Sequence, residues 1–196
     1  LGKYSEINYG YTTKASFSAD FVIGAVDGDN LLSDRVIQKG DVLIGLPSTG
    51  LHTNGYSLAR KVLLDKFKVD EYVSEINSTI SESLLSVHKS YLHILDKAIP
   101  KEWLLGLSHI TGGGLEGNTN RILTGDLKLN VDWDVWEWPN IFKLIQNVGN
   151  VPTDDMKKSF NLGIGMVLII KKDHISDAET YLKNINENYY IIGEIN

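Results

Sequence analysis

The chain has 196 residues, of which 42% are hydrophobic and 22% charged, so it is long enough to bury a core and does not resemble a disordered protein. Its 19 basic and 25 acidic side chains give a net charge of −6, which argues against a protein that coats nucleic acid but allows a local phosphate pocket. No apolar run approaches the roughly 20 residues that span a bilayer, and no signal peptide is visible, so we expect no membrane partner. The absence of cysteine removes disulfides, thiolate zinc sites and cysteine nucleophiles, and it suits a cytoplasmic location.

The first 18 residues are polar and show no periodicity, so we expect an arm or inter-domain linker there. An apolar run at 21–26 predicts a buried strand that ends in the turn-prone residues 27–30. A second apolar run, at 41–46, predicts another strand. Because the sequence begins with Leu1 and not with methionine, we expect it to be a piece of a longer protein.

Helices and strands alternate along the rest of the chain. A helix after residue 55 is predicted by apolar residues at helical spacing: Leu58, Val62, Leu63 and Phe67. A second helix, whole or broken, is predicted at 81–99, with Leu84, Leu85, Tyr91, Leu92, Leu95 and Ala98 facing inward. The later elements are helices near 115–123, 139–148 and 173–185 and strands at 127–131, 164–170 and 189–195. This intermixing predicts the α+β class, with mixed α/β layers in which a mixed sheet is flanked by helices, as one domain over residues 19–196.

The first of two glycine-bearing loops occupies residues 47–57. It carries hydroxyl, imidazole and amide side chains: Ser48, Thr49, Ser57, His52 and Asn54. Glycines let backbone N–H groups approach a ligand, and a following helix start favours an anion. The alternative is an ordinary strand-to-helix connector whose polar residues cap the helix.

The second loop, at 108–118, contains three consecutive glycines, Gly112, Gly113 and Gly114. Folding restricts the backbone of glycine more than that of other residues, which is unfavourable. Three glycines in a row are therefore expected only where a side chain would obstruct a close approach. With His109, Thr111, Asn118 and Arg121 around it, the loop predicts a phosphate site built from free N–H groups and a guanidinium. The alternative is a tightly packed loop with a structural histidine.

The sequence supplies no spacing typical of a metal site, so we predict none. His88 and His93 are five residues apart and do not share a helix face. The tryptophans Trp133, Trp136 and Trp138 are interpreted as core anchors, with a sugar or base platform as the alternative.

The two loops carry a family resemblance. The strings GDVLIGLPSTGLHTNGYSLARKVL (40–63) and HITGGGLEGNTNRIL (109–123) resemble the C-terminal domain of phosphoribosylformylglycinamidine cyclo-ligase, or aminoimidazole ribonucleotide synthetase. The resemblance continues through WEWPNIFKLIQNVGNV (136–151) and MKKSFNLGIGMVLII (156–170). One departure concerns the family's Leu-Leu-x-Pro-Thr-x-x-Tyr, which here reads Leu-Leu-Ser-Val-His-Lys-Ser-Tyr, so His88 stands where the pattern has threonine.

The resemblance implies an ATP-dependent ligase of purine biosynthesis, which closes formylglycinamidine ribonucleotide to aminoimidazole ribonucleotide. Phosphoryl transfer from ATP would turn the formyl oxygen into a leaving group, and the amidine nitrogen would then attack within the molecule. The family's N-terminal domain, which carries the motifs for ATP and Mg²⁺ and most of a homodimer interface, has no counterpart in this sequence. The resemblance therefore implies that this chain is the substrate-side half of the enzyme. It would be inactive alone and would bind its own N-terminal domain.

For the site, we expect both glycine loops to open into one cleft. His52 and His109 are the expected catalytic pair, because histidine exchanges protons near neutral pH. The other polar residues of the two loops, named above, are the expected substrate- or phosphate-binding groups. Two alternatives stay open: a non-catalytic interaction module, or another ATP-using member of the wider superfamily such as a selenophosphate synthetase.

Overall fold

The computed structural model describes residue 28 and residues 31–196, so the expected linker at 1–18 and strand at 21–26 lie outside the described residues. The contacts divide the chain into two units, Leu1–Leu31 and Leu32–Asn196, of which the second is compact. The helices and strands named below all belong to the second unit. Among the described residues, no helix is long and apolar enough to cross a membrane.

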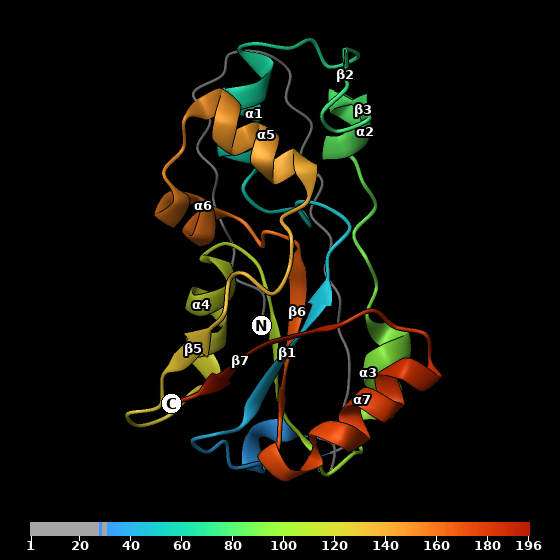
Figure 1. Ribbon diagram of the computed structural model, residues 1–196, viewed down its shortest axis with the longest axis vertical. Helices are drawn as coiled ribbons and strands as arrows, with labels where there is room; N and C mark the ends of the chain where they lie inside the picture. Colours follow the sequence, from blue (N-terminus) through green and yellow to red (C-terminus); the bar gives the residue numbers. More distant parts are fainter. Residues whose placement is uncertain (1–27, 29–30) are drawn as a thin grey trace. The chain divides into compact units, whose positions relative to one another are not determined.

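The second unit is built on a five-stranded sheet in the order β4-β6-β1-β7-β5. The strands are β1 (Val42–Pro47), β4 (Leu104–His109), β5 (Leu129–Val131), β6 (Ile164–Ile170) and β7 (Tyr190–Ile195). The predicted α+β class, a sheet flanked by helices, is confirmed (Figure 1). The sheet that we expected to be mixed contains only antiparallel pairs.

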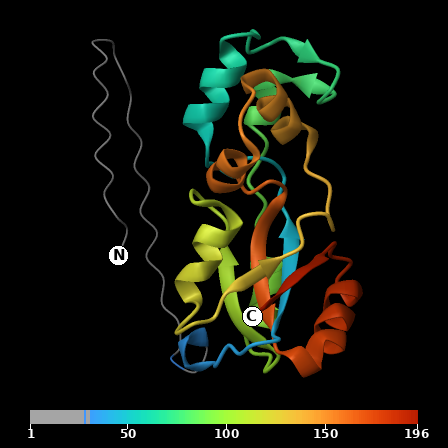
Figure 2. The ribbon, with the colours of Figure 1, turned by 60° about the vertical axis from the view of Figure 1, so that its left-hand side comes forward.

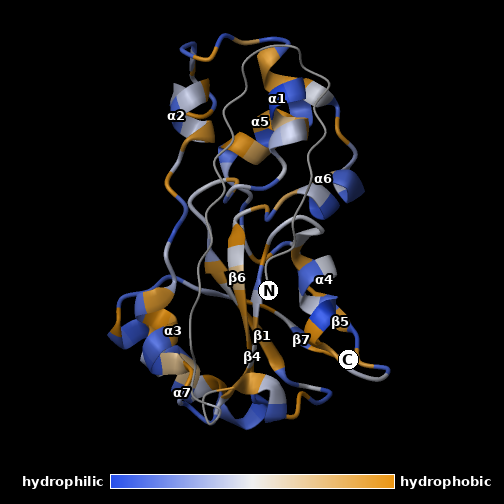
Figure 3. Cartoon of the chain, turned by 180° about the vertical axis from the view of Figure 1, so that it is seen from behind, coloured by the Kyte–Doolittle hydropathy of each residue, from blue (hydrophilic) through white to orange (hydrophobic). Residues whose placement is uncertain are grey.

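Strand β6 forms the middle of the core, because all seven of its residues are buried. Alternate side chains of a strand point to opposite faces of the sheet. Leu168 and Ile170 therefore pack with α3 (Leu92–Ala98) and α7 (Ile175–Asn184), whereas Val167 and Ile169 pack beside α4 (Gly114–Thr119). Figure 2 shows the sheet between these helices, and Figure 3 shows hydrophobic colouring along β6.

A separate apolar cluster lies at one end of the sheet, where α1 (Tyr56–Leu64) packs against α5 (Asn140–Gly149) (Figure 1). The small hairpin of β2 (Tyr72–Val73) and β3 (Ser78–Thr79), with α2 (Ile80–Leu84) and α6 (Thr153–Ser159), completes it. Helix α5, expected at 139–148, extends one residue further and ends at Gly149. Asn150 takes the left-handed conformation, with φ 45°, which asparagine tolerates better than most residues.

The predicted helix at 81–99 is broken. Helix α2 ends at Leu84, α3 begins at Leu92, and residues 86–91 between them form no helix or strand. The break changes which side chains face inward: Leu84, Tyr91 and Ala98 are buried, but Leu85 and Leu92 are 77% and 71% exposed, against our expectation. Periodicity assumes one continuous helix, and its phase is lost at the break.

Several short helices complete the unit: η2 (Leu32–Asp34), η3 (Asn120–Ile122) and η4 (Lys172–His174). Trp136 is a core anchor, as interpreted, because its ring is buried and its indole N–H donates to Leu162 O at 3.0 Å. Trp133 and Trp138 pack at the edges of the same apolar clusters.

Candidate functional site

The register of the sheet brings the two glycine loops together. Strands β1 and β4 pair with opposite edges of β6, and both run antiparallel to it, so they point the same way. Leu46 and His109, at the carboxyl ends of these strands, both pair with Met166. The loops that follow therefore leave the sheet at the same level, on either side of β6. Asn54 in the first loop accepts a hydrogen bond from the Gly112 N–H in the second, at 3.1 Å.

Asn118 holds the second loop in shape from inside. Its side chain is buried, donates to Gly114 O at 2.7 Å and Thr111 O at 3.1 Å, and accepts from the Thr111 hydroxyl at 2.9 Å. Three of its hydrogen-bonding groups are thus used within the loop. Asn118 and Thr111, which we expect to bind phosphate, are hydrogen-bonded to each other here and hold the loop in shape.

The glycine N–H groups are not free, which corrects our expectation of an open row of donors. Gly112 donates to Asn54, Gly113 to Lys158 O at 3.0 Å, and Gly114 to Thr111 O at 3.1 Å. The loop lies so close to α6 that a β-carbon on Gly114 would overlap the carbonyl oxygen of Lys157. Close backbone packing thus accounts for Gly114.

Arg121 supplies the positive charge that the sequence predicted for this loop. Its Nη2 atom lies 3.7 Å from where a β-carbon of Gly113 would be, so the side chain folds back over the exposed glycines. Arg121 makes no ion pair among the described residues. A planar guanidinium in this position is suited to an incoming phosphate.

The hydroxyls of the first loop have different surroundings. Ser48 donates to Asn161 at 2.9 Å, and Asn161 also accepts from the Gly163 N–H and donates to Gly50 O. Sequence reasoning missed Asn161, which is buried and holds the start of the loop. Ser57 is exposed in the first turn of α1, and the residue before that helix is Gly55, with no side-chain cap. The proposed capping role of the loop is therefore not seen.

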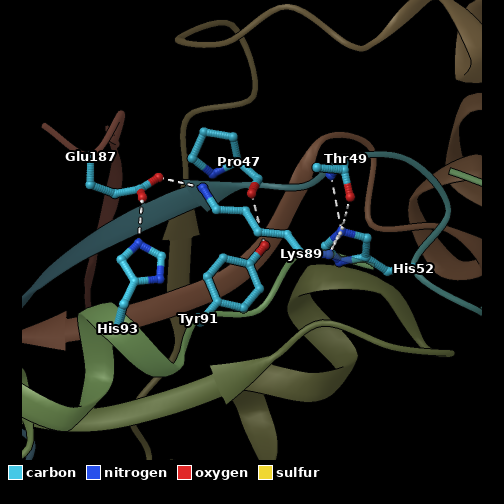
Figure 4. Close-up of polar contacts among 7 residues, drawn as sticks. All are labelled: Pro47, Thr49, His52, Lys89, Tyr91, His93 and Glu187. Carbon is cyan, nitrogen blue, oxygen red and sulfur yellow. Dashed lines mark hydrogen bonds and ion pairs between the residues drawn. The ribbon is translucent and has the colours of Figure 1, made fainter. Parts of the chain in front are cut away.

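His52 lies at the centre of the site and is 2% exposed. Its Nε2 accepts the Thr49 N–H at 2.9 Å and lies 3.0 Å from the Thr49 hydroxyl and 3.4 Å from the Lys89 N–H (Figure 4). Burial, followed by the nearby His88, His109 and Lys89, lowers the pKa of His52 to about 4. His52 is therefore a neutral hydrogen-bond acceptor near pH 7, not a group that titrates there.

Three histidines meet at this point, and we call His52, His88 and His109 the histidine cluster. The rings of His52 and His88 stack with centroids 4.0 Å apart. His88 Nε2 lies 3.3 Å from His109 Nε2. Burial and the neighbouring His88 lower the pKa of His109. Sequence reasoning missed His88, whose one signal was its departure from the family pattern.

The segment that carries His88 is held on both sides of it. Before His88, Val87 O accepts the Thr49 hydroxyl at 2.6 Å, and after it Lys89 and Tyr91 make the contacts drawn in Figure 4. Tyr91 donates to Pro47 O at 2.8 Å, and Lys89 forms an ion pair with Glu187, which His93 also contacts at 3.4 Å. Burial, and then the charge of Glu187, raises the pKa of Tyr91, so this phenol stays protonated. His93 therefore contacts Glu187, whereas His88 contacts His109.

Among the described residues, the histidine cluster is the one group of three or more acidic or histidine side chains that could hold a metal ion. Mg²⁺ prefers oxygen ligands, and the only carboxylate in either loop is Glu116, which is exposed on α4. The described site therefore does not fit Mg²⁺. It offers imidazoles, hydroxyls, amides and one guanidinium.

Comparison with known proteins gives a family. A family model described as "AIR synthase related protein, C-terminal domain" matches residues 38–196. A phosphoribosylformylglycinamidine cyclo-ligase of Pseudothermotoga lettingae is 42% identical over 178 residues, which are 90% of this chain and 52% of that protein. Another, of Thermodesulfovibrio yellowstonii, is 36% identical over 98% of this chain and 57% of that protein. The chain spans about half the length of the curated relatives it matches.

One solved structure has a similar fold. The crystal structure of tt0281 from Thermus thermophilus aligns with 82% of this chain and 48% of its own, with a TM-score of 0.50 and 13% sequence identity. At this identity the likeness concerns the fold alone.

Proposed function

The chain belongs to the family of AIR synthase related proteins, of which it carries the C-terminal domain, and we propose that it is the substrate-side half of a phosphoribosylformylglycinamidine cyclo-ligase. The complete enzyme would convert formylglycinamidine ribonucleotide and ATP to aminoimidazole ribonucleotide, ADP and phosphate. The observation that carries the proposal is the joining of the two motif loops through Asn54 and Gly112. One site then holds both of the sequence motifs that the family resemblance rests on.

The chemistry needs a better leaving group than a formyl oxygen. Transfer of the γ-phosphoryl group of ATP to that oxygen gives an imidate phosphate and ADP. The amidine nitrogen then attacks the formyl carbon, the carbon–oxygen bond breaks, and phosphate leaves. Because both reacting groups belong to one substrate, the closure is intramolecular, and binding lowers its barrier by fixing the approach of the nitrogen to the carbon. The task of this half is to bind the substrate, orient it and accept a proton.

Arg121 is the residue that we assign to an anionic group, either the substrate's ribose 5-phosphate or a phosphate of the nucleotide. Its guanidinium lies beside the exposed Gly113, where no glycine side chain blocks the approach of an anion. Because the glycine N–H groups already have acceptors, Arg121 carries most of this binding. Ser57 is exposed at the other loop and supplies a neutral donor, whereas the Thr49 hydroxyl already donates to Val87 O at 2.6 Å.

The two histidines of the proposed catalytic pair have different roles. His109 is exposed, and its lowered pKa leaves it neutral near pH 7, so it can accept the proton that the amidine nitrogen loses. His52 is buried and accepts the Thr49 amide, so its role is to hold the first loop in place. His109 is the proposed general base, and His52 is a positioning residue.

The binding of Mg-ATP is assigned to the rest of the proposed enzyme. The site described here does not fit Mg²⁺, so an N-terminal half would have to supply the ligands for Mg-ATP. A homodimer of the complete protein is part of the same proposal. On this account, the chain alone has no cyclo-ligase activity.

The experiment is an assay of the complete protein that contains this sequence as its C-terminal half. With formylglycinamidine ribonucleotide and Mg-ATP, the expected products are aminoimidazole ribonucleotide and ADP in equal amounts. The chain alone should form neither. A complete protein that binds ATP but forms no aminoimidazole ribonucleotide would favour the non-catalytic module, and use of another phosphoryl acceptor would favour another member of the superfamily.

A further inference from the structure

The histidine cluster brings together three imidazoles from three separate parts of the chain. His52 comes from the loop after β1, His88 from the irregular segment between α2 and α3, and His109 from the end of β4. Each offers one ring nitrogen, and the three nitrogens lie within 4.8 Å of one another. Three histidines with an open fourth position form a known type of ligand set for Zn²⁺.

The closest pair has the spacing of two ligands on one ion. His88 Nε2 and His109 Nε2 are 3.3 Å apart. With zinc–nitrogen bonds of about 2.0–2.1 Å and tetrahedral angles, two ligand nitrogens lie about 3.4 Å apart. The lone pairs of two neutral imidazoles repel at such a distance, so a proton or a metal ion has to lie between them.

His52 contributes a buried atom that needs a partner. Its Nδ1 is buried and has no hydrogen-bond partner among the described residues. An unsatisfied polar atom in the interior is unfavourable. Because Nε2 accepts the Thr49 and Lys89 N–H groups, Nδ1 carries the proton of the neutral ring, so a metal ion can bind Nδ1 only after that proton leaves. This observation is independent of the distance between His88 and His109.

Metal binding would change the stack of His52 on His88. The two rings are tilted by only 18°, and imidazole lone pairs lie in the ring plane, so both rings cannot point at one ion as they stand. Metal binding therefore requires the His88 ring to turn out of this stack, while the backbone on both sides of it stays held through Val87 and Tyr91. If His52 binds through Nδ1, its proton moves to Nε2, and the hydrogen bond from the Thr49 N–H is lost.

From these contacts we propose that His52, His88 and His109 bind a divalent transition-metal ion of the Zn²⁺ class, with water or an anion in the fourth position. The proposed cyclo-ligase reaction does not need such an ion, and His88 departs from the family pattern. A bound ion would occupy His109, the proposed base, and would therefore inhibit ring closure. The metal site uses residues of the proposed active site but does not depend on the reaction.

The test uses the whole 196-residue chain and the metals alone, without substrate or ATP. Co²⁺ is titrated while the visible absorption of four-coordinate cobalt is recorded, and Zn²⁺ is then added to displace it. We expect one equivalent to bind, and His88→Thr to weaken binding by about 100-fold or more, since even loss of a residue that only orients a ligand costs 10- to 100-fold. His174→Ala, which removes a partly exposed histidine paired with Asp177, is the matched control and should bind as the wild type does.

A second readout follows the Thr49 amide by NMR. Zn²⁺ should shift this signal in the wild type and leave it in place in His88→Thr, while the rest of the amide spectrum shows that both are folded. No cobalt band in the wild type, equal binding by His88→Thr, or loss of binding in His174→Ala would each overturn the proposal. Because no substrate is present, these outcomes leave the cyclo-ligase proposal standing, and failure of the activity assay leaves metal binding untouched.

Discussion

Asn54 and Gly112 are 58 residues apart in the chain, and their hydrogen bond of 3.1 Å is a direct polar contact between the two glycine loops. Asn54 also donates to His52 O at 2.7 Å, so one side chain connects the backbone of both loops. The position of Gly112 relative to His52 therefore depends on this amide. In the complete enzyme, the geometry of the site would depend on it as well.

Replacing Asn54 should affect activity more than stability. We expect Asn54→Ala to lower kcat/KM of the complete enzyme by roughly 10-fold or more, since small misplacements in a site are costly. The free energy of unfolding should fall by only about 1–2 kcal/mol, the contribution of two hydrogen bonds at a partly exposed position. Steady-state kinetics and chemical denaturation measure the two effects. Asn147→Ala, at an exposed position of α5, is the control; equal kinetics in both variants would show that the contact is dispensable.

Gly165 should tolerate no side chain, because β6 passes directly under His52 and Tyr91. A β-carbon there would lie 2.8 Å from His52 Nδ1 and closer still to Tyr91 Oη. We expect Gly165→Ala to lower the free energy of unfolding by about 1–3 kcal/mol through overpacking. Gly117→Ala, where a β-carbon meets nothing within 4 Å, should be neutral or stabilising by up to about 1 kcal/mol. Denaturation midpoints compare the two, and equal midpoints would contradict the packing described here.

His52 should make stability depend on pH below neutrality. Its folded pKa of about 4 lies below the ordinary value of 6.5, so in acid the unfolded chain binds a proton that the folded chain rejects. The stability contributed by the neutral ring is complete above pH 6.5 and is lost as the pH falls from 6.5 toward 4, by about 3 kcal/mol in all.

The measurement is the free energy of unfolding between about pH 7.5 and 4.5 for the wild type and for His52→Asn. Asparagine accepts hydrogen bonds and tolerates the left-handed backbone of His52, with φ 51°. The variant should lose less stability on acidification than the wild type. Parallel curves would mean that His52 has the same pKa in both states.

Arg121 should matter for anion binding and little for folding. Its side chain is exposed and makes no ion pair among the described residues, so Arg121→Gln should leave the melting temperature almost unchanged. Loss of a charge-assisted contact of about 1.5–3 kcal/mol predicts a 10- to 100-fold rise in KM for the substrate or for ATP. Arg60→Gln, also exposed, is the matched control, and an unchanged KM for both substrates in Arg121→Gln would remove it from the site.

Much of the fold could be predicted from the sequence because its signals are local. The apolar run that forms β6 and the spacing of Leu58, Val62 and Leu63 in α1 depend only on neighbouring residues. The strand order depends on contacts distant in the chain. Leu46 and His109 both pair with Met166, and neither strand's sequence alone predicts this pairing.

The site was predictable in part for the same reason. The glycine loops are visible as motifs, and Arg121 could be named as the cation beside the second loop. The acceptors of the glycine N–H groups lie in other elements, as with Lys158 O for Gly113, so their occupation could not be seen. His88 was missed because it faces His109 only when the helix is interrupted between α2 and α3.

If the two loops form one reaction site with His109 as the base, ring closure has to be slow without that imidazole, and the rate of ring closure in His109→Gln tests this most directly. Glutamine keeps a hydrogen-bonding side chain of similar length but accepts no proton near neutral pH. In a single turnover of the complete enzyme with saturating substrate and Mg-ATP, we predict that His109→Gln forms aminoimidazole ribonucleotide about 100-fold more slowly than wild type, while His174→Gln does not. Ring closure at the wild-type rate in His109→Gln would contradict the account.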